Sequence, residues 1–111
     1  MRRVILESPY AGDRDLNERY LSAALADSVA RGESPYASHA ILTRPGVLDD
    51  EDPGDRRRGI EAGFAWRDVA DATVVYADLG ISDGMRRGIA DAHGMRQDVE
   101  LRYLVGWEQE R

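Results

Sequence analysis

Two short loops in this sequence carry residue types that bind anions and sugar hydroxyls. Residues 7–13 (ESPYAGD) follow the apolar run 4–6, and residues 78–85 (DLGISDGM) follow the strand-like run 73–76. In an open parallel sheet, loops of this kind lie at the carboxyl ends of the strands, where ligands bind. Each loop also leads into a helical segment, whose free N–H groups and dipole favour anions such as phosphate. Together the two loops predict a pocket for a nucleoside or nucleotide.

The candidate ligand-binding residues come mainly from these loops. Tyr10 can stack on a base or orient a sugar hydroxyl, and Ser82 can cap a helix while also binding phosphate. Asp78 can hydrogen-bond a ribose or act as a base, although aspartate is also a common turn residue. His39 and Arg57 are candidates for contacts with phosphate, with structural roles as the alternatives. The full predicted set is Ser8, Pro9, Tyr10, Gly12, His39, Arg57, Asp78, Gly80, Ser82, Gly84 and Met85.

The composition limits the partners of this chain. Its 111 residues suffice for one domain with one core, and its formal net charge of −6 argues against a surface that binds nucleic-acid polymers. All 15 basic residues are arginine, so a basic side chain at an anion site must be an arginine. Cysteine is absent, which excludes disulfides, thiol catalysis and thiolate metal sites.

The sequence indicates a cytoplasmic protein without a metal ion or cofactor. No apolar run approaches the length needed to span a membrane, and the run 4–6 is too short for a signal peptide. The acidic run 49–52 (DDED) has ligands for a divalent cation, but such loops are more often solvated. We therefore expect no metal site, no cofactor and no membrane partner.

Strand and helix patterns alternate along the chain. β-Branched and apolar runs favour strands, and apolar stripes that begin at a capping residue favour helices. The predicted elements are strands at 2–7, 36–42, 73–77 and 99–104, separated by helices at 13–31, 53–69 and 83–93. This alternation requires right-handed crossovers and a parallel sheet covered by helices. It predicts a single doubly wound (Rossmann/flavodoxin-like) α/β domain with a parallel sheet of four to five strands.

Both loops resemble motifs of one enzyme superfamily. Residues 8–12 (SPYAG), followed by Asn17 and Tyr20, resemble the first motif of nucleoside 2-deoxyribosyltransferase-like proteins. The residues similar to the second motif are Asp78, Gly80, 82–85, Ile89 and Ala92. The similarity is to small, mostly phage-encoded members and covers most of the chain. It implies a nucleotide-binding domain at 1–105 and leaves 106–111 as a surface tail.

The resemblance also implies a position for the reacting side chain. In the enzymes of this superfamily, the second motif carries a glutamate one turn into the helix, which attacks the sugar C1′ and displaces the base. In this sequence that position falls at or beside Gly88, and residues 86–89 (RRGI) contain no carboxylate. Glycine has no side chain with which to form a glycosyl intermediate. The carboxylates that could replace the glutamate are Asp78, Glu7 and Glu61.

Two functions are therefore open. A nucleotide-sized pocket without its nucleophile suits a binding protein, such as a phage sponge that sequesters a nucleotide immune signal derived from ADP-ribose or a cyclic nucleotide. The alternative is an N-glycosidase or deoxyribosyltransferase acting on nucleosides or nucleoside monophosphates, with another carboxylate stabilising an oxocarbenium-like transition state. The missing glutamate favours binding. Since superfamily pockets are often completed by a neighbouring subunit, we expect a homo-oligomer, a dimer or larger.

Overall fold

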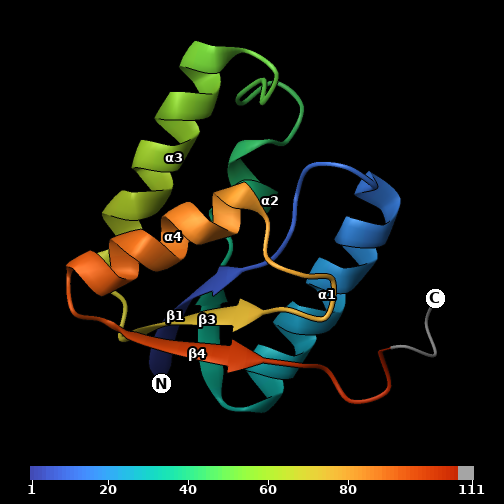
Figure 1. Cartoon of the computed structure of the whole chain (residues 1–111), viewed down its shortest axis with the longest axis vertical. Coiled ribbons are helices and arrows are strands. Elements are labelled where there is room, and N and C mark those ends of the chain that lie inside the picture. The colour runs from blue at the N-terminus through green and yellow to red at the C-terminus, as the bar shows by residue number, and fades with distance from the viewer. Residues whose placement is uncertain (108–111) are drawn as a thin grey trace.

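Four parallel strands form the centre of the structure (Figure 1), a computed structural model that describes residues 1–107. The strands are β1 (Arg2–Glu7), β2 (Glu33–Tyr36), β3 (Ala72–Tyr76) and β4 (Asp98–Arg102). Their order in the sheet is β2-β1-β3-β4, and every neighbouring pair is parallel. The arrangement confirms the predicted doubly wound α/β fold with a sheet of four to five strands.

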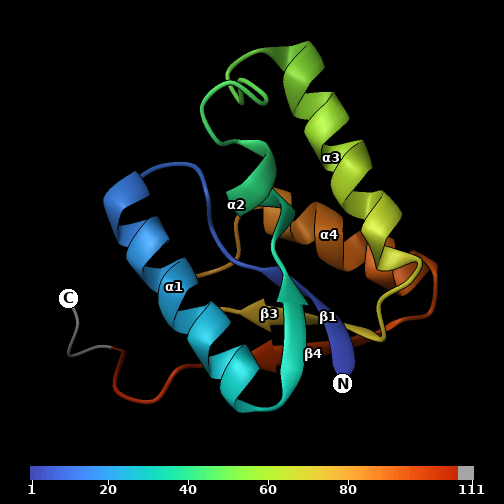
Figure 2. The same ribbon diagram turned by 180° about the vertical axis from the view of Figure 1, so that it is seen from behind.

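Helices cover both faces of this sheet. α1 (Arg14–Ala30) lies over one face, and α4 (Asp83–Gly94) lies over the other (Figures 1 and 2). α3 (Pro53–Arg67) packs against α4 and β1, and the short α2 (Ser38–Leu42) packs against α3. None of the helices within residues 1–107 is both long and apolar enough to cross a membrane.

The strand order places the two predicted loops side by side. β1 and β3 are neighbours, with Leu6 opposite Val74 and Glu7 opposite Val75, although they are far apart in sequence. From β1 the chain continues to β2, which lies on one side of the β1–β3 pair. From β3 it continues to β4, which lies on the other side of that pair. Such a reversal of strand order opens a crevice at the carboxyl ends of the two strands. The loops after β1 and β3 therefore flank the usual ligand position of this fold class.

The structure corrects the prediction of a strand at 36–42. The second strand comes earlier, at Glu33–Tyr36, and residues Ser38–Leu42 form α2 instead. Pro35 lies within this strand because β2 is an edge strand, where a missing N–H is tolerated. The correction moves His39 from a strand to a helix above the end of the sheet.

The predicted surface tail at 106–111 also begins too early. The Trp107 side chain is buried and packs edge-on against Tyr20, with ring centroids 4.8 Å apart. Both residues belong to the main apolar cluster formed by β1, β3 and α1. Burial of a large aromatic ring outweighs the turn-like sequence around it. Residues 108–111 lie outside the described residues.

A buried ion pair fastens the two edge strands to each other. Arg102 in β4 donates two hydrogen bonds to Glu33 in β2, at 2.8 and 2.7 Å. The exposed fractions of their side chains are 4% and 5%. Tyr76 accepts a third bond from Arg102, and Ser28 donates to Glu33. The contact with Arg102 lowers the pKa of Glu33 to about 2.

Glu33→Gln is expected to lower the free energy of unfolding by about 2 kcal/mol at pH 7, because it leaves a buried guanidinium without its main counter-charge. Since the pKa of Glu33 is lower in the folded state, its contribution is complete above pH 4.5 and disappears as the pH falls toward 2. Urea unfolding of wild type and variant between pH 2 and 7 measures both effects. Asp98→Asn, at the exposed start of β4, is the control and should unfold like wild type. Equal stability of Glu33→Gln and wild type at pH 7 would contradict the prediction.

Candidate functional site

A cavity of about 190 Å³ opens at the carboxyl ends of β1 and β3, and we name it the Glu7 pocket. Both predicted loops contribute to its wall, the first through Ser8, Tyr10 and Ala11 and the second through 82–85. The other lining residues come from β1, α2 and α3. They are Ile5, Glu7, Ser38, His39, Ile60, Gly63, Phe64 and Arg67. The structure thus brings the two loops to one cavity, as the sequence predicts.

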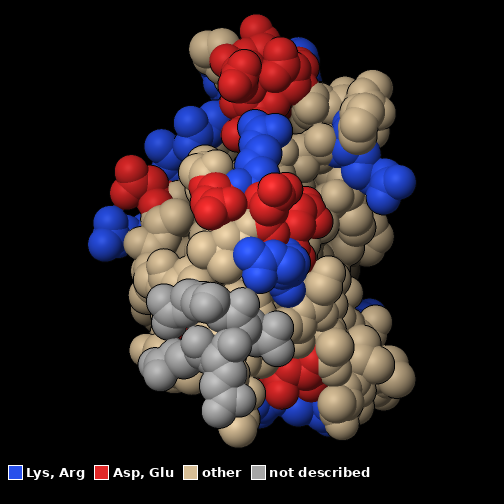
Figure 3. Space-filling view, turned by 90° about the vertical axis from the view of Figure 1, so that its right-hand side faces the viewer, with Lys and Arg blue, Asp and Glu red and all other residues tan. Residues whose placement is uncertain are grey.

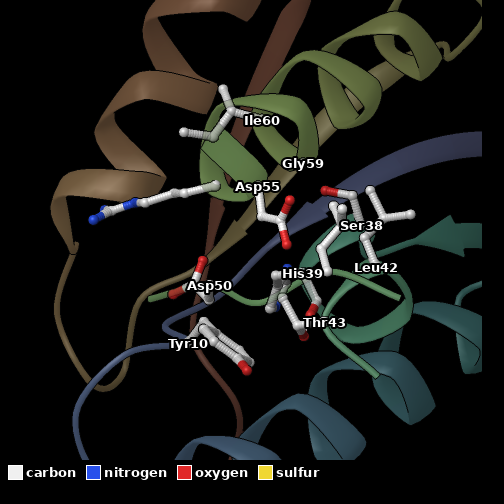
Figure 4. Close-up of a pocket in the computed structure, with 11 residues that line it drawn as sticks. Tyr10, Ser38, His39, Leu42, Thr43, Asp50, Asp55, Gly59 and Ile60 are labelled. Carbon is white, nitrogen blue, oxygen red and sulfur yellow. Dashed lines mark hydrogen bonds between the residues drawn. The ribbon is translucent and has the colours of Figure 1, made fainter. Parts of the chain in front are cut away.

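A second cavity of about 120 Å³ adjoins the first, and we name it the side pocket. The two share Tyr10, Ser38, His39 and Ile60 as common wall. Figure 4 shows Tyr10 and His39 on one side of the side pocket, with Gly59 and Ile60 of α3 opposite. The remaining lining residues are Leu42, Thr43, Leu48, Asp50, Asp55 and Arg56. The combined space is a cleft with a polar inner end at Glu7 and a more apolar outer end.

The Glu7 carboxylate occupies the space where a side chain at position 88 would lie. A Cβ atom placed on Gly88 would be 2.1 Å from Glu7 Oε2 and 2.6 Å from Glu7 Cδ. Gly88 lies in the second turn of α4, whereas Glu7 ends β1. A side chain at position 88 and the Glu7 carboxylate in its observed position are therefore sterically exclusive. The carboxylate beside Gly88 comes from strand β1 and not from helix α4.

Burial and one arginine determine the charge of Glu7. Its side chain is 15% exposed, and desolvation raises the pKa of its carboxyl to about 7. Arg67 opposes this rise through a hydrogen bond from Nη2 to Glu7 Oε2 of 2.6 Å. Asp91, which also pairs with Arg67, raises the pKa of Glu7 further. Glu7 therefore exchanges a proton near neutral pH, which suits a general acid or base.

Ser8, His39 and Tyr10 form a polar and aromatic group beside Glu7. The Ser8 hydroxyl and His39 Nε2 are 2.9 Å apart, and burial lowers the pKa of His39 to about 4. The imidazole is thus neutral at pH 7. It meets the Tyr10 ring edge-on at a centroid distance of 6.3 Å, and the Arg14 guanidinium lies over that ring at 5.2 Å. This group offers rings and neutral hydrogen-bonding atoms to a ligand.

The start of α4 combines a cap with a pocket wall. Ser82 Oγ accepts a hydrogen bond of 3.3 Å from the Met85 N–H, so the cap interpretation of Ser82 holds. Ser82 and Gly84 also line the Glu7 pocket. Asp83 at the same helix end forms an ion pair of 3.3 Å with Arg86. Both the N-terminus of α4 and the Asp83 carboxylate therefore contribute to the electrostatic potential at this wall of the pocket.

Several candidate residues lie away from the Glu7 pocket. Asp78 accepts hydrogen bonds from Tyr20 Oη at 2.6 Å and the Leu104 N–H at 2.9 Å, so it ties the chain after β4 to α1.

Arg57 and Glu61 are exposed on α3. The neighbouring Arg56, not Arg57, borders the side pocket. Three further candidates, Pro9, Gly12 and Gly80, are also absent from the lining of both cavities. Of the three candidate carboxylates, only Glu7 reaches the site.

Sequence reasoning named Arg57 and Glu61 on α3 as candidates and missed the residues of this helix that line the Glu7 pocket. Ile60, Phe64 and Arg67 lie on one helical stripe and line the Glu7 pocket. The spacing i, i+4, i+7 is a signal for this face, but nothing local in the sequence shows that Arg67 is buried with it. Gly63 on the same face is in close contact with α2, since an added Cβ would be 2.5 Å from Ser38 Oγ.

The acidic side chains do not gather around the cleft as a metal site. Figure 3 shows acidic residues clustered at the end of the molecule where the loop before α3 lies, with basic residues interspersed below. Among residues 1–107, no group of three or more histidine, aspartate or glutamate side chains is arranged to hold a metal ion. The absence of a metal or cofactor remains a prediction.

The fold resembles that of a solved nucleoside-modifying enzyme. A 2-deoxyribosyltransferase from the psychrotolerant bacterium Bacillus psychrosaccharolyticus superposes with a TM-score of 0.66 at 16% sequence identity, covering 94% of this chain and 74% of that chain. At this identity the similarity concerns the fold. No curated protein matches the sequence. The model of a domain of unknown function, DUF7768, matches residues 2–102, and the chain belongs to that family.

Proposed function

We propose that the Glu7 pocket binds a nucleoside or nucleotide and that Glu7 acts on its N-glycosidic bond. The observation that carries this proposal is the position of the Glu7 carboxylate, which lines the pocket and fills the space beside Gly88. The superfamily resemblance puts the attacking glutamate at or beside Gly88. The similarity in fold to a 2-deoxyribosyltransferase supports the same general kind of function.

Glu7 has the chemistry that cleavage of this bond needs. With a pKa of about 7, a substantial fraction of the carboxyl is ionised at neutral pH. The ionised form attacks C1′, or stabilises positive charge there, as the bond from C1′ to the base nitrogen breaks. The base leaves with the bonding electron pair and takes a proton. Water in hydrolysis, or a nitrogen of a second base in transfer, then bonds to C1′ and gives up a proton to Glu7 or solvent. Where Glu7 has bonded to C1′, that bond breaks in this step and its electron pair returns to the carboxylate.

The two cavities suggest how the ligand is oriented. The sugar would lie in the Glu7 pocket, so that C1′ faces the carboxylate. The base would extend past Tyr10 and His39 into the side pocket, where apolar side chains and the Asp50 carboxylate are available. Aromatic rings at this boundary can hold a base by stacking. Arg56 lines the side pocket, and together with Arg14 it lines a neighbouring cavity. These two arginines form no ion pair within residues 1–107 and suit a phosphate.

Binding without turnover is the second candidate function. It is favoured by one observation: Glu7 Oε2 is already held by Arg67 in a largely buried position. A carboxylate so engaged is a weaker nucleophile than a free one. In that case the chain would be a sponge of the kind outlined above, sequestering a nucleotide signal.

Product analysis distinguishes the two functions. Purified protein is incubated with nucleosides, nucleoside monophosphates, ADP-ribose derivatives and cyclic dinucleotides, denatured, and analysed by liquid chromatography. We expect free base in molar excess over protein from at least one nucleoside or monophosphate. Bound but fully intact ligand would support the sponge, and neither binding nor release from the whole panel would overturn both candidates.

Native mass spectrometry of the same sample tests the proposed homo-oligomer. Trp66, which is 54% exposed and lies 5.2 Å from the Tyr36 ring, forms an apolar surface with Val69 next to the edge strand β2. Such a surface suits a second copy of the chain. A monomer at all protein concentrations would contradict this part of the proposal.

A further inference from the structure

We infer that Arg67, held in place by Thr73 and Asp91, is a positioning residue that fixes the Glu7 carboxylate in the pocket. The inference rests on the proposed function only where it gives Glu7 a reaction. The geometry that supports it involves no ligand. Arg67 is 1% exposed, although it lies at the carboxyl end of α3, where an arginine would ordinarily reach solvent.

The Arg67 guanidinium is bound from three directions. Nε donates to Thr73 Oγ1 in β3 at 3.0 Å, and Nη1 donates to Asp91 Oδ2 in α4 at 2.9 Å. Nη2 donates to Glu7 Oε2 in β1 at 2.6 Å. Because these partners belong to three elements, the planar group cannot rotate without losing at least one bond. The direction of the Nη2 bond, and with it the position of Glu7, is therefore fixed by the fold.

Gln97 fixes the orientation of the Thr73 hydroxyl, whose oxygen accepts the hydrogen bond from Arg67. The Thr73 hydroxyl donates to Gln97 Oε1 at 2.6 Å, which leaves the lone pairs of the Thr73 oxygen free to accept from Arg67. The Gln97 amide in turn donates to the backbone carbonyls of Arg67 and Ala70, at 2.9 and 3.1 Å. Arg67 thus donates in two directions, to Glu7 in the pocket and to Thr73, which in turn donates to Gln97.

Two carboxylates share this single buried cation. Asp91 is 32% exposed and Glu7 is 15% exposed, so Glu7 is the more deeply buried of the two carboxylates. Arg67 favours the charged form of Glu7, whereas Asp91 disfavours it. The other ionisable side chains that line the same pocket are Tyr10, Asp83 at the start of α4 and the neutral His39 of α2. Arg67 and Asp91 therefore act on the Glu7 proton in opposite directions.

A titration of Glu7 by carbon-13 NMR tests the inference in the full chain without any ligand. Arg67→Gln is expected to raise the midpoint of the Glu7 titration by about one pH unit or more, because it removes the adjacent positive charge. Asp91→Asn is expected to lower the midpoint, because it removes a negative charge and leaves Arg67 to Glu7 alone. Arg57→Gln, on the exposed side of α3, is the matched control and should leave the midpoint unchanged.

Opposite shifts in Arg67→Gln and Asp91→Asn support the inference, and unchanged midpoints in both overturn it. If Arg67→Gln fails to fold by circular dichroism, Arg67→Lys and Asp91→Asn keep the test possible, since lysine retains the charge but cannot bind three partners at once. Base release is measured separately. Opposite shifts without base release would retain the positioning role of Arg67 and reject the proposed reaction. Base release with unchanged midpoints would retain the proposed reaction and reject the positioning role.

Discussion

Glu7→Gln is expected to lower the rate of base release from the identified substrate by about 10²- to 10⁴-fold, the range for loss of an acid–base group. Glutamine keeps the length of the side chain and can still accept a hydrogen bond from Arg67, so the pocket should keep its shape. It has no ionisable carboxyl, however, and cannot stabilise charge at C1′. Single-turnover measurement by liquid chromatography reports the chemical step, and calorimetry on the same variant should show nearly unchanged ligand affinity.

An exchange of the two sterically exclusive positions sharpens this test. In Glu7→Ala combined with Gly88→Glu, the carboxylate comes from α4 and enters the space that Glu7 vacates. We expect the double variant to recover base release to within about tenfold to a hundredfold of wild type. Glu61→Gln, exposed on α3, is the control with no expected effect. Base release by Glu7→Gln at the wild-type rate would reject Glu7 as the reacting group.

The sequence predicted the fold because the signals that determine it are local. Buried strands such as Ala72–Tyr76 are continuous apolar runs, and α1 and α4 begin at side-chain caps, Asp13 and Ser82. The second strand was misplaced because its inward residue is the charged Glu33, which sequence patterns assign to the surface. Glu33 is buried because Arg102, 69 residues later, neutralises it together with Arg2.

The candidate site was predictable only in part, for the same reason. The loops after β1 and β3 could be paired because strand order in doubly wound sheets follows general rules. The choice among carboxylates could not be made, since it depends on contacts between distant residues. Asp78 is occupied by Tyr20 and Leu104, and Glu7 faces Arg67 across 60 residues of sequence. A glycine in the middle of α4 was the one local signal that another side chain fills that space.

Gly88→Ala is expected to destabilise the protein by about 3 kcal/mol, although alanine is the better helix former. The added Cβ would overlap the Glu7 carboxylate, which must move away from Arg67. Displacement of Glu7 disrupts a buried ion pair and leaves Arg67 with fewer partners, a change that costs several kcal/mol when the loss is complete. Overpacking of the surrounding side chains adds to the effect. Urea unfolding monitored by circular dichroism measures the change.

A double-mutant cycle shows whether Glu7 is the cause of this destabilisation. In the Glu7→Ala background the space beside position 88 is vacant, so Gly88→Ala should be neutral or stabilising by up to about 1 kcal/mol. Gly94→Ala is the matched control within α4, because an added Cβ there meets no atom within 4 Å. The coupling energy between positions 7 and 88 is then about 3 to 4 kcal/mol. Equal destabilisation by Gly88→Ala in both backgrounds would mean that other atoms restrict this position, and the exchange of carboxylates between β1 and α4 would lose its structural basis.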